Sequence, residues 1–333
     1  MYCRTIRLLT YAMVSILSLA QFAHADEAPI KIAMLIPGEI DDGGFMEAGY
    51  RGLMDVQNEL GFDTVFSMNI GPKREELKAA LKQLVSTDPD LIITHGGQTS
   101  EVVKLMAGSY PEIQFVVIQG NVTGENLSSY EVLQEESAWL AGAAAGMLTE
   151  SGTVGHISGL RMAPGLKGRG AFYNGLMATN PEAEYLTTFA GDQDDSTLAY
   201  RVATAEIAAG ADVIFTMLNA GRQGAIDAAK EKGVWQIGNV NDWVSVDPSV
   251  FIGSAIADVS QAVFQAASDF SNHAWESDRI VQIGLDNSNA VRLSLSESVS
   301  EEVRDQIDAM SKAIVAGEID VSIAYSGDEF TAL

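Results

Sequence analysis

The stretch KIAMLIPGEIDDGGFMEAGYRGL, residues 31–53, gives the first indication of an α/β fold, because it joins a strand-like segment to a helix-like one. Residues 31–36 are short, apolar and bounded by Pro37-Gly38, a pattern that predicts a buried strand. From Met46 onward, apolar residues recur at helical spacing, which predicts a helix to about residue 60. Residues 41–44, two acids and two glycines, are therefore expected to form a strand-to-helix loop, with Phe45 at or before the first helical turn.

Two interpretations of Phe45 stay open. In open parallel sheets, loops beyond the carboxyl ends of strands are where ligands bind, so Phe45 and Asp41 are candidates to line a ligand site. Alternatively, Phe45 fastens the helix start onto the strand, which is the interpretation that periodicity alone favours.

Outward from this stretch, strand-like and helix-like segments alternate along the chain. Such alternation predicts parallel sheets covered by helices on both faces. One series ends near residue 120 and a second runs from ESAWLAGAAAGML (136–148) to VWQIGNV (234–240), more than one compact sheet holds. We therefore predict an α/β protein of two Rossmann-like lobes, joined first near residues 121–134.

Strand–helix pairs remain after residue 240, which predicts that the chain crosses back to the first lobe. The expected boundaries are 26–128 plus about 250–285 for the first lobe, and 129–249 plus about 286–333 for the second.

Residues 1–25 have the pattern of a secretory signal peptide. Two arginines precede an apolar run, and Ala23-His24-Ala25 forms a small-x-small cleavage site before Asp26. Cys3 precedes the apolar run, so it is not placed as a lipidated cysteine would be. We expect a periplasmic or secreted protein that is soluble after cleavage and not lipidated.

Charge and cysteine content exclude several classes of function. The formal net charge is −25 and becomes more negative when Arg4 and Arg7 leave with the signal. Nucleic-acid polymers bind through clustered Lys and Arg, so they are not expected as partners. The mature chain has no cysteine, which excludes a structural disulfide, a thiolate metal site and a cysteine nucleophile.

The sequence contains none of the common motifs for catalysis or metal binding. The mature histidines are far apart, and there is no HExxH or GxSxG pattern. GLKGRG (165–170) is predicted to be a flexible turn, because no GK[ST] follows. GDQDDS (191–196) either contacts ligand or caps a helix. His95 either faces a cleft or is a hydrogen-bonded structural residue, and Trp139 is expected in the core.

Several longer stretches resemble the basic-membrane-protein (Bmp/PnrA-like) family of ABC-importer substrate-binding proteins, many of which are purine-nucleoside receptors. They are IDDGGFMEAGYRGL, DLIITHGG, QEESAWLAGAAAGMLTESGTVGHISGL, GADVIFTMLNAGRQGAIDAAKEKGVWQIG and AIVAGEIDV, in order over nearly the whole mature chain. The resemblance implies a type I periplasmic-binding fold, with two lobes joined by three crossovers and ligand in the cleft. It also implies an ABC permease in the inner membrane as partner.

The resemblance implies that Phe45 stacks on the ligand, whereas other binding positions depart from the family pattern. Val240 stands where the family has an Asp that grips ribose hydroxyls, and Ala257 where it has a Lys. The further departures are Met46 and Glu47 for two amides, Gln119 for an Asp, and about Gln193 for a second aromatic. A carboxylate makes strong, charge-assisted bonds to hydroxyls, and a buried hydroxyl left unpaired costs about 1–3 kcal/mol. Free bases or other small planar solutes are therefore expected to bind better than ribonucleosides.

The resulting hypothesis is a monomeric solute receptor without catalytic residues, cofactor or metal. Two rivals stay open: a receptor that presents its ligand to a membrane sensor, and an exported enzyme using carboxylates such as Asp194 and Asp242. The predicted ligand-binding residues lie in strand–helix loops of both lobes. They are Asp41, Phe45, Gly96, Gly97, Gln119, Gln193, Asp194, Asn219, Asn241, Asp242 and Trp243.

Overall fold

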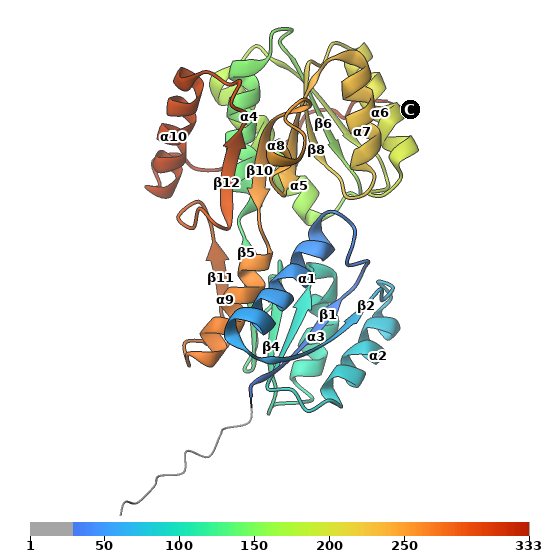
Figure 1. Ribbon diagram of the computed structural model, residues 1–333, viewed down its shortest axis with the longest axis vertical. Coiled ribbons are helices and arrows are strands. Elements are labelled where there is room, and N and C mark those ends of the chain that lie inside the picture. The colour runs from blue at the N-terminus through green and yellow to red at the C-terminus, as the bar shows by residue number, and fades with distance from the viewer. Residues whose placement is uncertain (1–28, 333) are drawn as a thin grey trace, which may run out of the picture.

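The computed structural model describes residues 29–332, and they form two lobes, each built on a six-stranded sheet (Figure 1). The predicted signal peptide, residues 1–25, lies outside the described residues. Within residues 29–332, no helix combines the length and the apolar character needed to cross a membrane.

The first lobe contains a parallel sheet in the order β11-β5-β4-β3-β1-β2. Its strands are β1 (Lys31–Ile36), β2 (Asp63–Met68), β3 (Leu91–His95), β4 (Gln114–Ile118), β5 (Leu127–Val132) and β11 (Ile280–Ile283). Its helices are α1 (Phe45–Asp55), continued by a π-helical turn at Val56–Leu60, α2 (Arg74–Val85), α3 (Ser100–Ala107) and α9 (Ser260–Ser271).

Strand β1 is buried on both of its faces, which explains why its sequence is apolar throughout. Met34 and Ile36 pack into the core that contains α1 and α9, whereas Ala33 and Leu35 pack into a separate core with α2 and α3. Because successive side chains point to opposite faces, a strand covered on both faces needs a continuous apolar run. The prediction of a doubly covered parallel sheet is confirmed for this lobe.

The second lobe contains a sheet in the order β12-β10-β9-β8-β6-β7. Its strands are β6 (Thr153–Ser158), β7 (Glu184–Phe189), β8 (Val213–Met217), β9 (Trp235–Val240), β10 (Phe251–Ala257) and β12 (Val291–Leu295). Its helices are α4 (Gln134–Leu148), α5 (Ala163–Thr179), α6 (Ser196–Ala208), α7 (Arg222–Lys232), α8 (Trp243–Val246) and α10 (Glu301–Val315). All its strand pairs are parallel except β10 with β12, which is antiparallel.

Helices α4 and α5 pack so closely that glycine is required at their contact. A Cβ on Gly142 would lie 1.9 Å from the carbonyl oxygen of Phe172, and one on Gly175 would lie 1.9 Å from that of Trp139. Trp139 is buried, as the sequence predicted for a core residue. The small residues of AGAAAG thus allow two helices to cover one face of the second sheet at short range.

Three chain segments join the lobes, but their positions correct the predicted boundaries. The chain leaves the first lobe between β5 and α4, returns between β10 and α9, and leaves again between β11 and β12 (Figure 1). Strand β10 therefore belongs to the second lobe, although the sequence assigned residues from about 250 to the first. Strand β5, assigned from residue 129 to the second lobe, belongs to the first.

Candidate functional site

The candidate site lies where loops at the carboxyl ends of strands in the two lobes meet. We call this contact the junction; it comprises residues 41–44 of the first lobe and residues 218–221 and 239–243 of the second. Asn219 donates from Nδ2 to Oδ2 of Asp42 at 3.0 Å, and Asn241 donates from Nδ2 to the carbonyl oxygen of Gly43 at 3.1 Å. A Cβ on Gly44 would lie 2.6 Å from Oδ1 of Asn219, so glycine permits this close approach.

Asp42 holds the first-lobe side of the junction in place. Its carboxylate accepts hydrogen bonds from the backbone N–H groups of Gly44 at 2.8 Å, Met46 at 3.1 Å and Glu47 at 3.1 Å. These bonds satisfy donors at the start of α1 that have no partner within the helix. Asp41, the predicted ligand-binding residue of this loop, is exposed, whereas Asp42 was not among the predicted residues. The position of Asp42 shortly before the helix start was the sequence signal for its capping role.

Phe45 stacks on His95, with ring centroids 4.1 Å apart and planes inclined by 26°. His95 is fully buried, and its Nε2 lies 2.8 Å from the carbonyl oxygen of Phe45. Burial lowers the pKa of His95 to about 4, although the bond to the Phe45 carbonyl acts in the opposite direction. The imidazole is therefore neutral at pH 7 and donates from Nε2. Phe45 itself is only partly buried, with His95 beneath it.

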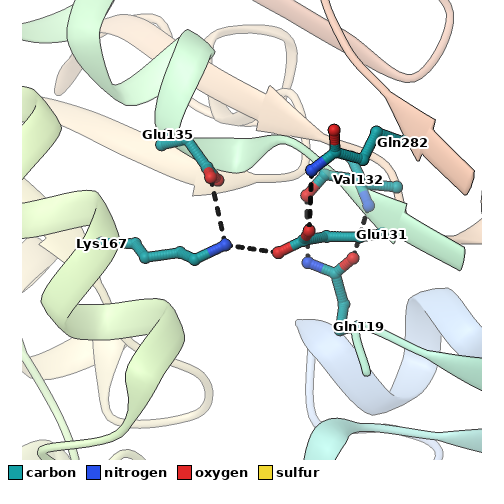
Figure 2. A network of polar contacts seen from close by, with 6 residues as sticks. All are labelled: Gln119, Glu131, Val132, Glu135, Lys167 and Gln282. Carbon is teal, nitrogen blue, oxygen red and sulfur yellow. Dashed lines mark hydrogen bonds and ion pairs between the residues drawn. The ribbon is translucent and has the colours of Figure 1, made fainter. Parts of the chain in front are cut away.

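Gln119 and the glycines after β3 pack against the chain near the first crossover. Gln119 accepts from the backbone N–H of Val132 and donates from Nε2 to the Val132 carbonyl at 3.1 Å (Figure 2). A Cβ on Gly97 would lie 2.8 Å from the carbonyl oxygen of Gln119, and Gly96 has a φ of +94°. The side-chain amide predicted to bind ligand is thus paired with the end of β5.

Lys167 links the lobes at a second place (Figure 2). From α5 its ammonium contacts Glu131 on β5 and lies 3.2 Å from Oε1 of Glu135, while Gln282 donates to Glu131 at 3.3 Å. Burial alone would lower the pKa of Lys167, but the two carboxylates raise it, so the group stays cationic. The prediction of a flexible turn at GLKGRG is wrong, because these residues lie within α5. The three glycines of this segment suggested a turn, whereas in α5 two of them allow close packing: a Cβ on Gly168 would lie 2.6 Å from the Cε of Met217, and one on Gly170 would lie 1.9 Å from the carbonyl oxygen of Ile323.

In the second lobe, Trp243 packs within its own lobe. Its Nε1 donates to the carbonyl oxygen of Asn239 at 3.1 Å, its ring lies 4.5 Å from Cζ of Arg222, and the ring of Phe251 is 5.7 Å away. A Cβ on Gly238 would lie 2.5 Å from the indole. Asp242 caps α8 by accepting from the backbone N–H of Ser245 at 3.4 Å. The sequence placed both residues in the ligand site but offered no sign of these contacts.

The loop with GDQDDS is tied to the loop after β8. The carbonyl oxygen of Gln193 accepts from the N–H groups of Asn219 at 3.1 Å and Gly221 at 3.0 Å, and Asp194 accepts from that of Ala220 at 3.2 Å. Burial raises the pKa of Asp194, and the charges of Asp192 and of Asp42 in the first lobe add to the increase. The capping interpretation of GDQDDS is confirmed for Asp195, which caps α6.

Comparisons with known proteins place the chain among solute receptors. The family model for the PnrA-like ABC transporter substrate-binding proteins (Bmp) matches residues 30–323. The transcriptional activator protein Med of Bacillus subtilis is 25% identical over 246 residues, which cover 74% of this chain and 76% of that protein. TsgA13 of Haloferax volcanii, a putative ABC transporter glucose-binding protein, is 26% identical over 306 residues, covering 90% and 77% of the two chains.

Among solved structures, an ABC transporter solute-binding protein from Aeropyrum pernix superposes with a TM-score of 0.75 at 22% identity. The match covers 90% of this chain and 94% of that one. This likeness shows that the two-lobed fold is that of periplasmic binding proteins.

Proposed function

We propose that this chain, which belongs to the PnrA-like family of ABC transporter substrate-binding proteins, binds a small planar solute between its lobes. Proteins of this family bind a small ligand outside the cytoplasm and work with a membrane permease. The observation that carries the proposal is the pair formed by Phe45 and His95. The neutral imidazole stacks on one side of the Phe45 ring, and the ring remains partly exposed beside the junction.

A planar solute fits the groups around that ring. Stacking on an aromatic face favours flat ligands, and a few convergent polar groups then fix their orientation. Asn219 and Asn241 supply amides that both donate and accept, and they now satisfy Asp42 and Gly43 across the junction. Entry of a solute would exchange these contacts for bonds to the ligand.

Two buried apolar residues disfavour the binding of nucleosides. Val240 and Ala257 stand where the resemblance implies an Asp and a Lys, and both are buried. Neither can bond a ribose hydroxyl through its side chain. We therefore propose that free bases bind better than ribonucleosides.

The charge around the junction disfavours anionic solutes. Asp42 and Asp194 approach each other from opposite lobes closely enough for the charge of one to raise the pKa of the other. Lys167, which reaches between the lobes, is already paired with two carboxylates. A nucleotide phosphate would meet net negative charge, so the ligand is proposed to be neutral or cationic.

A thermal-shift screen followed by calorimetry tests the proposal. The panel contains hypoxanthine, adenine, inosine, guanosine, adenosine monophosphate and glucose, the last because a relative carries the name of a glucose-binding protein. A ligand that binds the native state raises the melting temperature, and we expect this from the bases and not from the monophosphate. Tight binding of inosine with no response to bases would contradict the proposed ligand class, and a response to glucose alone would transfer it to sugars.

The same panel separates a receptor from an enzyme. Each solute that binds is incubated with the protein and the mixture is analysed by chromatography. We expect the solute to be recovered unchanged, and conversion to product would overturn the receptor proposal.

A further inference from the structure

Arg222 is a buried cation that has no acidic partner. It is the first residue of α7, its side chain is 2% exposed, and none of residues 29–332 forms an ion pair with it. Burial lowers the pKa of Arg222 to about 9, so the guanidinium still carries its charge at pH 7. Burying an unpaired charge is costly, and a cation at a helix N-terminus also opposes the helix dipole. A residue that breaks both rules needs a compensating role.

The guanidinium bonds to both second-lobe loops of the junction. Nη1 donates to the carbonyl oxygen and to Oγ1 of Thr216, each at 3.0 Å, at the end of β8. Nη2 donates to the carbonyl oxygen of Leu218 and, at 2.6 Å, to Oδ1 of Asn239 on β9. Leu218 precedes Asn219 directly, and Asn239 lies two residues before Asn241. One planar group thus fixes the two loops that carry the cross-lobe asparagines.

The loop after β9 shows a second departure from ordinary local structure. Val240 has a φ of +67°, a conformation that β-branched residues rarely adopt. Such strain persists where the surroundings enforce it, and it is concentrated at functional sites. The neighbours that enforce it are Asn239, held by Arg222, and Trp243, whose ring covers Arg222 and whose Nε1 donates to the Asn239 carbonyl.

We propose that Arg222 is the positioning residue of the second-lobe half of the binding site. It couples residues 218–221 to residues 239–243, so that Asn219 and Asn241 are presented together to the first lobe. The role of Arg222 in ligand binding rests on the proposed function, whereas its coupling of the two loops is a property of the ligand-free protein. Arginine suits this role because its rigid fork donates in several fixed directions, which a lysine ammonium cannot reproduce.

Hydrogen–deuterium exchange on the full chain tests the coupling without any ligand. Backbone amides of Asn219, Gly221, Asn241 and Trp243 are hydrogen-bonded and report on the two loops. We expect Arg222→Met to speed exchange in both loops by about tenfold or more, with Arg222→Lys in between. The matched control is Arg304→Met, because Arg304 also donates to several backbone carbonyls but lies at α10. This control should leave exchange in the two loops unchanged.

Unchanged protection in Arg222→Met, or an equal increase in Arg304→Met, would overturn the assignment. If Arg222→Met does not fold, Asn239→Ala removes the acceptor at the other end of the bridge and is judged by the same criterion.

Calorimetry with hypoxanthine then tests whether the positioning of the two loops by Arg222 affects ligand affinity. We expect Arg222→Met to bind about tenfold more weakly than wild type and Arg304→Met. Equal affinity of wild type and Arg222→Met would also overturn the assignment. If wild type responds to no member of the panel, the proposed function fails, while the exchange experiment still decides the role of Arg222.

Discussion

The two lobes each place one aromatic ring beside the junction, and the two rings have different surroundings. In the first lobe, Phe45 rests on the neutral ring of His95 and keeps part of its surface exposed. In the second lobe, Trp243 lies over Arg222, contacts Phe251 and donates its N–H to Asn239. Both rings begin a helix that follows a strand and both are partly buried, but Phe45 has one aromatic partner, whereas Trp243 contacts a cation, a second ring and a backbone carbonyl.

The difference shows that position in the fold does not assign a role to a ring. The residue that supports Phe45 is fifty positions away on β3, and the one under Trp243 lies on α7. How many contacts a ring makes within its own lobe depends on these distant partners. The first prediction below contrasts the two rings directly, and the later ones compare a residue with a matched control.

The largest expected effect is on stability, from removal of the second-lobe ring. Trp243→Ala deletes the contacts with Arg222 and Phe251 and the bond to Asn239, and we expect it to lower the free energy of unfolding by about 3 kcal/mol. Phe45→Ala should lower it by about 1 kcal/mol, because that ring is partly buried and its removal breaks one aromatic contact, the stack on His95. Urea unfolding of both variants measures the contrast. Equal losses would show that the two rings are equally structural.

The second prediction concerns the buried histidines, one in each lobe. Burial lowers the pKa of His95 to about 4 and that of His156 to about 3, the latter also through the charge of Arg169. The unfolded chain protonates histidine near pH 6.5, so in the window from 6.5 down to 4 it binds protons that the native state does not. Stability should therefore fall as the pH is lowered through this window. From pH 7 to pH 5 the contribution of His95 is about 2 kcal/mol.

The contribution of His95 to the pH dependence of stability is measured as a difference between variants, because Glu206 changes stability with pH in the opposite direction. Burial raises the pKa of Glu206 well above its ordinary value, so the native state binds a proton that the unfolded chain releases near neutral pH. His95→Gln should lose less stability than wild type between pH 7 and pH 5. The control is His273→Asn, whose side chain is exposed and whose positive φ suits asparagine. A pH profile for His95→Gln parallel to that of wild type would contradict a neutral native His95.

These contrasts also show what the sequence could and could not predict. Alternating apolar and amphipathic segments predicted two α/β lobes and a returning chain, since buried parallel strands need continuous apolar runs. The boundary at β10 was wrong because β10 and α9 look like one strand–helix unit, although the crossover passes between them. Local patterns do not reveal which sheet a strand joins.

The candidate site was predicted less completely, because partner choice is a tertiary property. Asn219 and Asn241 were chosen from their places after strands, and the structure puts both at the contact between lobes. Gln119 was chosen because it stands where the resemblance implies an Asp, but its side chain pairs with Val132. Arg222 was missed, since an arginine at the start of a helix ordinarily indicates an exposed side chain.

The third prediction concerns ligand binding and tests the ring of the first lobe. Phe45→Ala should weaken binding of hypoxanthine by about tenfold, because a stacking contact contributes about 0.5–1.5 kcal/mol beyond the area that it buries. Phe45→Tyr keeps an aromatic face and serves as the control with nearly wild-type affinity. Calorimetry at one pH measures both. Wild-type affinity in Phe45→Ala would remove the ring from the site and leave it as a fastener of the helix start.

The smallest expected effect separates the two adjacent acids of the first-lobe loop. Asp42 accepts three backbone N–H bonds at the start of α1 and one from Asn219, whereas Asp41 is exposed. Loss of a capping side chain typically costs about 1 kcal/mol, and exposed substitutions usually stay within about 0.5 kcal/mol. Asp42→Ala should therefore lower the free energy of unfolding by about 1 kcal/mol, while Asp41→Ala leaves it nearly unchanged. Asp42→Asn keeps one acceptor oxygen and should lie between them, which distinguishes loss of the cap from loss of charge. Chemical denaturation resolves the series, and equal effects of Asp41→Ala and Asp42→Ala would show that the loop does not depend on the cap formed by Asp42.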